Sequence, residues 1–142
     1  MSDMTHDIMA QWLKDQAITE VECLVSDIAG IPRGKILPVH KFSQAAVGQG
    51  LRLPEYVFGQ SVTGAFLDSA VLNEIGKDVI LRPDPATCRL VPWYSEPTAQ
   101  IIHDAFDHDG SIVPFSPRAV LKRVLALFES AGLRPIVAPE LE

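Results

Sequence analysis

Hydrophobic residues recur with a helical period near the end of the chain. Six of them lie three or four positions apart on one face of a helix: Val120, Leu121, Val124, Leu125, Phe128 and Ala131. Ser116 suits the N-cap of this helix, and Pro117 suits its first turn, where a missing N–H leaves no bond unmade. Gly132 suits the left-handed position that ends many helices. The pattern therefore predicts a capped helix between Ser116 and Gly132.

A short apolar run follows this helix and leads into two carboxylates. Ile136 and Val137 predict a buried strand that approaches Pro139. Continuation of this strand to the last residue places Glu140 and Glu142 on the same face, roughly 6.5–7 Å apart. Carboxylates at this spacing favour a hard divalent cation, Mg²⁺ or Mn²⁺, because such ions take oxygen ligands. The alternative interpretation is a frayed, solvated acidic terminus.

The earlier part of the chain alternates between strand-like and helix-like patterns. We expect a helix at 5–15, strands at 19–28 and 31–37, a helix within 38–48, and short strands at 79–81, 88–91 and 99–103. This order predicts an α+β fold in which one helix packs on a sheet. It is the element order of a β-grasp, or ubiquitin-like, domain. We assign residues 1–16 to an N-terminal helix, 17–113 to the β-grasp domain and 114–142 to the beginning of a further domain.

Composition excludes several classes of protein. The chain has 142 residues, of which 47% are hydrophobic and 21% charged, as in a soluble globular protein. Its net charge is −6 and its basic residues are scattered, so we expect no nucleic-acid partner. No apolar run is long enough for a membrane span, and the first residues lack the pattern of a signal peptide. Cys23 and Cys88 have no metal-ligand spacing, so reduced thiols in a cytoplasmic protein are expected.

Three local patterns suggest chemistry that the spacing does not support. Residues 103–110 are rich in His and Asp, but a calcium loop with Gly110 at its sixth position puts Ala105 and Ser116 where carboxylates are required. Residues 30–35 are one residue too short for a phosphate loop and lead into a strand. Ser61 has no histidine or acid at a recognisable spacing. We therefore interpret these segments as a turn, a hairpin with basic residues and a loop.

Four motifs, in order, resemble those of the glutamine synthetase family, above all the γ-glutamylpolyamine synthetases. Residues 27–35, DIAGIPRGK, are similar to the family's D-x-x-G-x-x-R-G-K segment. Residues 77–87, with the following Val91-Pro92-Trp93, are similar to its D-x-x-L-x-P-D-x-x-T and P-W run. Pro117-Arg118 resembles the entry to its catalytic domain, and Glu140-Leu141-Glu142 resembles its metal-binding E-x-E.

The resemblance implies an ATP-dependent ligase that joins glutamate to ammonia or an amine through γ-glutamyl phosphate. Glu140 and Glu142 are then metal ligands for Mg²⁺ or Mn²⁺, and Asp78 contributes to the amine side of an adjacent subunit's site. ATP, glutamate and the amine are the implied small-molecule partners, and a homo-oligomer is the implied assembly. Residues 58–64 match a loop that carries an acid in the family, and that acid is absent here, so the identity of the amine stays open.

Most of the active site implied by the resemblance lies outside this sequence. We therefore expect residues 114–142 to be the incomplete beginning of a catalytic domain, and the chain alone to be an inactive fragment. The alternative is a stand-alone β-grasp module that binds or regulates without catalysis. This alternative leaves the final helix without a sheet to join and exposes Val120, Val124, Leu125 and Phe128. Exposed apolar stripes of this kind favour self-association.

Overall fold

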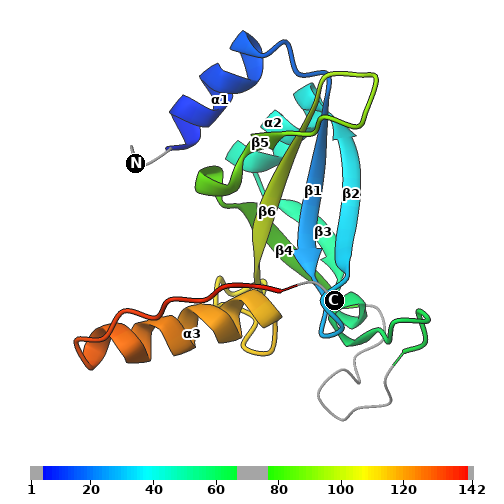
Figure 1. Ribbon diagram of the computed structural model, residues 1–142. Coiled ribbons are helices and arrows are strands. Elements are labelled where there is room, and N and C mark those ends of the chain that lie inside the picture. Colours follow the sequence, from blue (N-terminus) through cyan, green and yellow to red (C-terminus); the bar gives the residue numbers. More distant parts are fainter. Residues whose placement is uncertain (1–4, 67–76, 141–142) are drawn as a thin grey trace.

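The computed structural model describes residues 5–66 and 77–140 (Figure 1). The elements in chain order are α1 (His6–Asp15), β1 (Glu20–Ser26), β2 (Pro32–Pro38), α2 (Val39–Val47), β3 (Leu51–Pro54), the 3₁₀ turn η1 (Glu55–Gly59), β4 (Asp78–Pro83), the 3₁₀ turn η2 (Pro85–Thr87), β5 (Arg89–Leu90), β6 (Thr98–Phe106) and α3 (Pro117–Ser130). The α+β class and the order of the predicted elements are confirmed. None of the described helices is long and apolar enough to cross a membrane.

The strands form one mixed sheet with the order β2-β1-β6-β4-β3, and β5 pairs with β6. β1 and β2 make an antiparallel hairpin, whereas β1 and β6 run parallel from Glu20↔Thr98 to Leu24↔Ile102. β4 lies antiparallel to both β6 and β3. β6 therefore joins the hairpin to the rest of the sheet at the centre of the fold.

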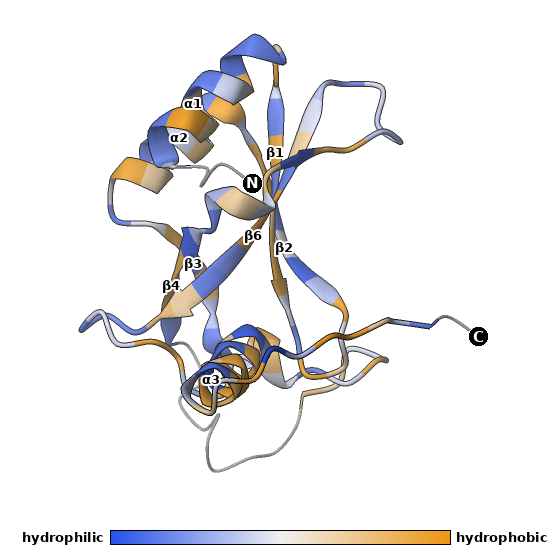
Figure 2. Cartoon of the chain, turned by 60° about the vertical axis from the view of Figure 1, so that its left-hand side comes forward, coloured by the Kyte–Doolittle hydropathy of each residue, from blue (hydrophilic) through white to orange (hydrophobic). Residues whose placement is uncertain are grey.

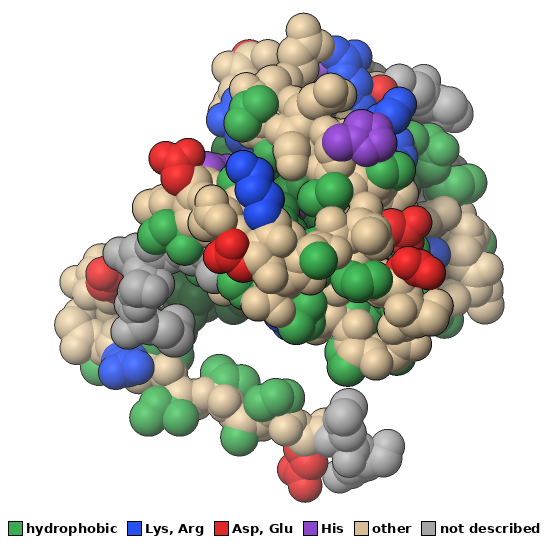
Figure 3. Space-filling view, turned by 90° about the horizontal axis from the view of Figure 1, so that it is seen from above, with side chains coloured by type: hydrophobic (Ala, Val, Ile, Leu, Met, Phe, Trp, Pro, Cys, Tyr) green, Lys and Arg blue, Asp and Glu red, His purple; other side chains and the backbone are tan. Residues whose placement is uncertain are grey.

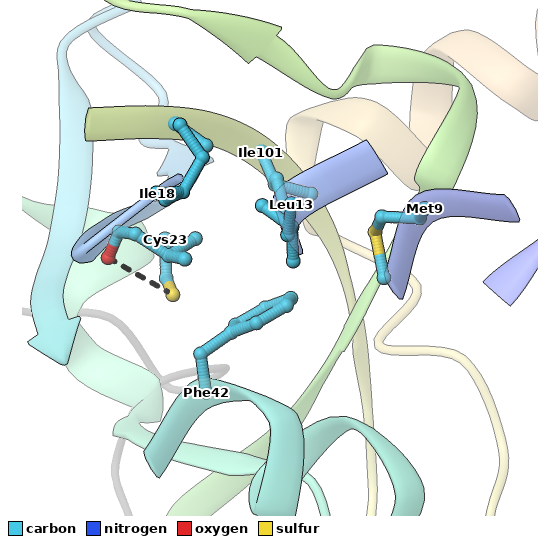
Figure 4. Close-up of a cluster of buried hydrophobic side chains, with 8 residues drawn as sticks. Met9, Leu13, Ile18, Cys23, Phe42 and Ile101 are labelled. Atoms are coloured by element: carbon cyan, nitrogen blue, oxygen red, sulfur yellow. Dashed lines mark hydrogen bonds between the residues drawn. The ribbon is translucent and has the colours of Figure 1, made fainter. Parts of the chain in front are cut away.

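The core lies on one face of the sheet, under α1 and α2. β1 alternates so that Val21, Cys23 and Val25 are buried, as a period of two residues predicts. The first cluster contains Met9 and Leu13 of α1 together with side chains of α2, β1 and β6 (Figure 4). A second cluster continues along the same face, where its members pack around β4: Val25, Leu53, Phe58, Val79, Leu81, Ala105 and Val113. Figure 2 shows α1 and α2 at one end of the sheet and α3 at the other.

The predicted C-terminal helix is confirmed, including its caps. The hydroxyl of Ser116 accepts from the N–H of Ala119 at 3.4 Å, Pro117 occupies the first turn, and Gly132 has φ of +70°. The N–H of Leu133 donates back to the carbonyl of Phe128 at 2.9 Å. Such a bond is typical of helices that end in glycine.

The buried strand predicted at Ile136 and Val137 is wrong. Residues 133–140 contain no strand, and the two side chains are 93% and 82% exposed. No neighbouring strand pairs with this segment within the described residues, and the prolines at 135 and 139 remove two N–H donors. Its apolar side chains lie apart from the body of the protein (Figure 3).

Candidate functional site

Parts of two matched motifs, residues 27–33 and 77–78, lie at one end of the sheet. β1 and β3 both run toward this end, and β4 begins there at Asp78, opposite Pro54. We call it the hairpin end and define it as residues 27–33, 54–66, 77–78 and 107–112. α3 begins beside it (Figure 1). Segments far apart in the sequence are therefore brought together at the place where the sequence predicts chemistry.

Asp27 organises the turn between β1 and β2. Its side chain is buried, and one carboxylate oxygen accepts from the N–H groups of Ala29 at 2.9 Å and Ile31 at 2.8 Å. The other oxygen accepts from Nε of Arg33 at 2.8 Å. Burial alone raises the pKa of Asp27, but the bonds from Arg33 and the two backbone groups outweigh it, so this pKa lies below its ordinary value. The first motif residue is thus a charged anchor of the hairpin.

Arg33 connects this hairpin to the loop after η1. Its Nη2 donates to the carbonyl of Ser61 at 3.4 Å, and the N–H of Ile28 donates to the carbonyl of Phe58 at 3.1 Å. The Ser61 hydroxyl accepts from the N–H of Ala65 at 3.1 Å and closes the loop on itself. The loop that lacks the expected acid is therefore held in place by the D-x-x-G-x-x-R segment.

The remaining residues of this motif are also structural. A Cβ added to Gly34 would lie 1.8 Å from the carbonyl oxygen of Cys23, so the two strands can approach only with glycine here. The ammonium of Lys35 donates to the carbonyl of Arg52 at 2.9 Å and links β2 to β3. The predicted hairpin with basic residues is confirmed, and two of its cations bond within the fold.

The second motif forms the turn that follows β4. A carboxylate oxygen of Asp84 accepts from the N–H of Ala86 at 3.1 Å and caps η2. The Thr87 hydroxyl donates to the carbonyl of Asp84 at 2.8 Å and accepts from the N–H of Ile102 at 2.9 Å. The P-D-x-x-T residues therefore attach the end of β4 to β6.

Asp84 also contacts α3 and helps to attach this helix to the sheet. The Arg118 guanidinium bonds to Asp84 through Nη2 and to Asp104 through Nε, the latter at 2.9 Å. The ammonium of Lys122 lies 2.5 Å from the second oxygen of Asp104. The partly buried pairs of Arg118 and the exposed pair of Lys122 fix the first turns of α3 against the sheet. Sequence reasoning missed the role of Asp104, which stands in a His- and Asp-rich run with no pairing signal of its own.

The three predicted site residues are not brought into one cluster by the described part of the chain. Asp78 is half-buried at the hairpin end, and its carboxylate has no hydrogen bond or ion pair to another described residue. Neighbouring Lys77 pairs with Asp107 at 2.8 Å. Glu140 is exposed in the segment after α3, whereas Glu142 lies outside the described residues.

The described residues do not by themselves fit a divalent metal. No group of three or more His, Cys, Asp or Glu side chains that could hold a metal ion occurs within residues 5–66 and 77–140. Magnesium usually needs several oxygen ligands in near-octahedral geometry, and Glu140 supplies one carboxylate. We therefore derive no metal-dependent step from this part of the chain.

The sequence of this chain is similar to part of several larger proteins. No family model matches the chain. It is 30% identical to type-1 glutamine synthetase 2 of Dictyostelium discoideum, over 96% of this chain and 26% of that protein. It is 32% identical to γ-glutamylputrescine synthetase PuuA of Escherichia coli, over 86% of this chain and 26% of that protein.

Comparison of structures supports the same fold. A solved GmaS/ADP complex superimposes with a TM-score of 0.66 and 23% identity, over 92% of this chain and 26% of that chain. This chain matches the N-terminal region of members of the glutamine synthetase family. It spans about a quarter of the length of these relatives.

Proposed function

We propose that these 142 residues are the N-terminal region of an ATP-dependent ligase that forms a γ-glutamyl amide. The observation that carries this proposal is the match over 96% of the chain to a glutamine synthetase, with motif residues that anchor the fold. The name of the second relative, a γ-glutamylputrescine synthetase, supports an amine as well as ammonia among the acceptors to be tested.

We further propose that residues 17–113 form a β-grasp domain. A hairpin of β1 and β2, a helix packed on one face, and a late strand lying parallel to β1 support this assignment. Residues 114–142 would then begin the catalytic domain. The exposed apolar stripe of α3 supports this boundary, because a helix that joins a further sheet needs such a face.

The proposed reaction has two steps. The γ-phosphoryl group of ATP passes to an oxygen of the glutamate γ-carboxylate, and the amine nitrogen then attacks the acyl carbon. Phosphate leaves with the bonding electrons and the nitrogen loses a proton. Mg²⁺ or Mn²⁺, when bound, neutralises phosphate charge in such transfers. Glu140 and Glu142 are its proposed ligands, provided that further oxygen ligands lie beyond these residues, since two carboxylates bind metal weakly.

Asp78 is the proposed residue of this chain on the amine side. It lies at the hairpin end, in the same region as the loop at residues 58–64, and its carboxylate has no partner among the described residues. An unpaired carboxylate at a rim can hold an ammonium group before it loses its proton. The Ser61 loop supplies hydroxyls but no charge, so Asp78 is the nearer match to a cationic acceptor.

Phosphate release in the presence of ATP, glutamate and a panel of amines tests the proposal. We expect none from the 142-residue chain and amine-dependent release from the complete reading frame that contains it. In that protein Asp78→Asn should raise the KM for the amine about ten-fold, as expected for loss of a charged hydrogen bond. Asp109→Asn, an exposed acid of the same end, is the control. Phosphate release by the 142-residue chain would contradict its proposed role as an inactive N-terminal region. An unchanged amine KM in Asp78→Asn would contradict the proposed role of Asp78.

A second candidate function is a stand-alone β-grasp module that binds or regulates a partner. It is favoured by the two core clusters, which are complete without the second half of α3. It leaves Val120, Val124, Leu125 and Phe128 exposed. A monomeric, stable 142-residue chain in size-exclusion measurements supports this alternative, whereas oligomers that form through α3 support the ligase.

A further inference from the structure

A groove runs along the edge of the sheet where α2 turns into β3. It encloses about 390 Å³ and is lined by the turn after α2, by β4 and by two histidines from elsewhere in the chain. We call it the edge groove and define it by His6, Gly48, Gly50, Arg52, Arg82 and His108. Asp78, Glu140 and the loop at residues 58–64 do not line it, so it is separate from the proposed ligase site.

The strand register brings two arginines to one face of this groove. Arg52 of β3 lies opposite Ile80 of β4, and Arg82 is two residues further along β4. Opposite residues, and residues two apart, share a face of a sheet, so both side chains leave from the same side. Diagonal neighbours of this kind lie roughly 7–8 Å apart. This separation is between backbone positions, and arginine side chains are long enough for both guanidinium groups to reach one anion from it, although Phe106, on which Arg82 stacks, lies on the β6 side of β4.

Gly50 contributes no side chain to the space beside Arg52 and Arg82. Continuing the register past Leu51↔Leu81 places Gly50 opposite Arg82. A Cβ at this position, which has φ of +80°, would lie 2.4 Å from Cγ2 of Ile80. The turn is thus pressed against β4 by a residue that contributes no side chain to the groove.

The two arginines have no carboxylate partner among the described residues, because Asp104, which lies opposite Arg82 on β6, pairs with Arg118 and Lys122 instead. No aspartate or glutamate lines it, and neither Arg52 nor Arg82 forms an ion pair within residues 5–66 and 77–140. Nη2 of Arg52 has one long contact, 3.5 Å to Gln49. The Arg82 guanidinium stacks on Phe106, 4.6 Å from the ring centre, which orients the group and leaves its N–H donors free for another acceptor. Two like charges at this spacing repel unless an anion lies between them.

We propose that the edge groove binds a small phosphate-bearing molecule, whose phosphate is bridged by Arg52 and Arg82. The planar guanidinium group matches the geometry of phosphate oxygens. Two guanidinium groups match the charge of a phosphate better than the single charge of a carboxylate. His6 and His108 supply further ring N–H donors along the groove. The volume lies within the range of small-ligand pockets.

Calorimetric titration of the 142-residue chain with inorganic pyrophosphate tests this proposal. We expect saturable binding of one molecule per chain, weakened about ten-fold or more in Arg52→Gln and in Arg82→Gln, because each loses a charged hydrogen bond. Both side chains are exposed, so both variants should fold, and their thermal unfolding checks this. Arg134→Gln, an exposed arginine outside the groove, is the matched control and should bind within about two-fold of the parent.

A parallel titration with ADP distinguishes the two sources of the phosphate. Equal affinity for ADP and pyrophosphate assigns the site to the free anion, whereas tighter binding of ADP assigns it to a phosphorylated metabolite whose organic part also contacts the groove. Absence of saturation at millimolar concentrations of both probes overturns the proposal. So does an equal loss in Arg134→Gln, because this result means diffuse attraction to positive charge.

Discussion

Acidification is expected to destabilise the domain through one buried histidine. His103 of β6 is 2% exposed and packs edge-on against Phe42 of α2, with ring centres 6.3 Å apart. Its Nδ1 lies 3.1 Å from the carbonyl oxygen of Ile101. Burial lowers the pKa of His103 to about 4, although bonds to the backbone of Ile101 and Leu24 and the charge of Asp104 act in the opposite direction. The imidazole is therefore neutral in the folded protein.

The direction and size of the effect follow from linkage. The ordinary pKa is 6.5, so the unfolded chain takes up a proton at a pH where the folded chain does not. The free energy of unfolding falls as the pH drops below 6.5, and the loss is complete below about 4. A difference of about 2.5 in pKa corresponds to about 3 kcal/mol, a large part of the stability of a small domain.

Urea unfolding at several pH values between 6.5 and 4 measures this loss, and His103→Gln is the informative variant. Its stability is lower throughout, but the pH slope in this window should largely disappear. His40→Gln, an exposed histidine on α2, should keep the parental slope. The pKa of Asp27 lies below its ordinary 3.8, so the stability from that carboxylate is lost only at lower pH. An equal slope in the parent and His103→Gln would refute the reasoning.

Two further substitutions and one alkylation experiment test the packing of the domain. Gly34→Ala should lower the free energy of unfolding by about 3 kcal/mol, because the added Cβ would meet the carbonyl of Cys23. Gly64→Ala should lower it by about 1 kcal/mol, because the added Cβ is in open space but the backbone has positive φ. The urea midpoints of the two variants measure this difference. Arg118→Gln should cost about 1–2 kcal/mol and speed proteolysis of α3, and Arg123→Gln, exposed on the same helix, should not. Burial, with a smaller effect of Glu22, raises the pKa of the Cys23 thiol to about 12, so mass spectrometry should show its alkylation only after unfolding.

Local signals in the sequence were sufficient for most of the secondary structure. The alternation of Val21, Cys23 and Val25 identifies the buried face of β1, and Ser116 with Gly132 marks the ends of the last helix. These features depend on neighbours in the chain, so a single sequence contains them. Parallel pairing of β1 with β6 joins residues almost eighty positions apart, and no local pattern specifies it.

The predicted strand at Ile136 and Val137 shows the limit of this approach. An apolar pair between prolines favours an extended backbone, and the segment is indeed not helical. A strand also needs a partner that supplies N–H and carbonyl groups, and apolar residues predict burial only where a surface is present to cover them. The apolar residues of this segment therefore indicate that it can pack against an apolar surface. They do not indicate that such a surface is present among the described residues.

The motif residues illustrate a related distinction between resemblance and role. The resemblance identified Asp27, Arg33 and Arg118 by position, but only the geometry shows that they are anchors rather than reactive groups. Asp27 and Arg33 hold a loop at the hairpin end, and Arg118 holds the helix that leads toward Glu140. Loss of one partner of such a partly buried charged pair leaves the other charge without compensation, which lowers the free energy of unfolding. The chain's contribution to the proposed reaction is thus mainly positioning: it presents Asp78 and the Ser61 loop at one end of the sheet, and the chemistry depends on what binds at that end.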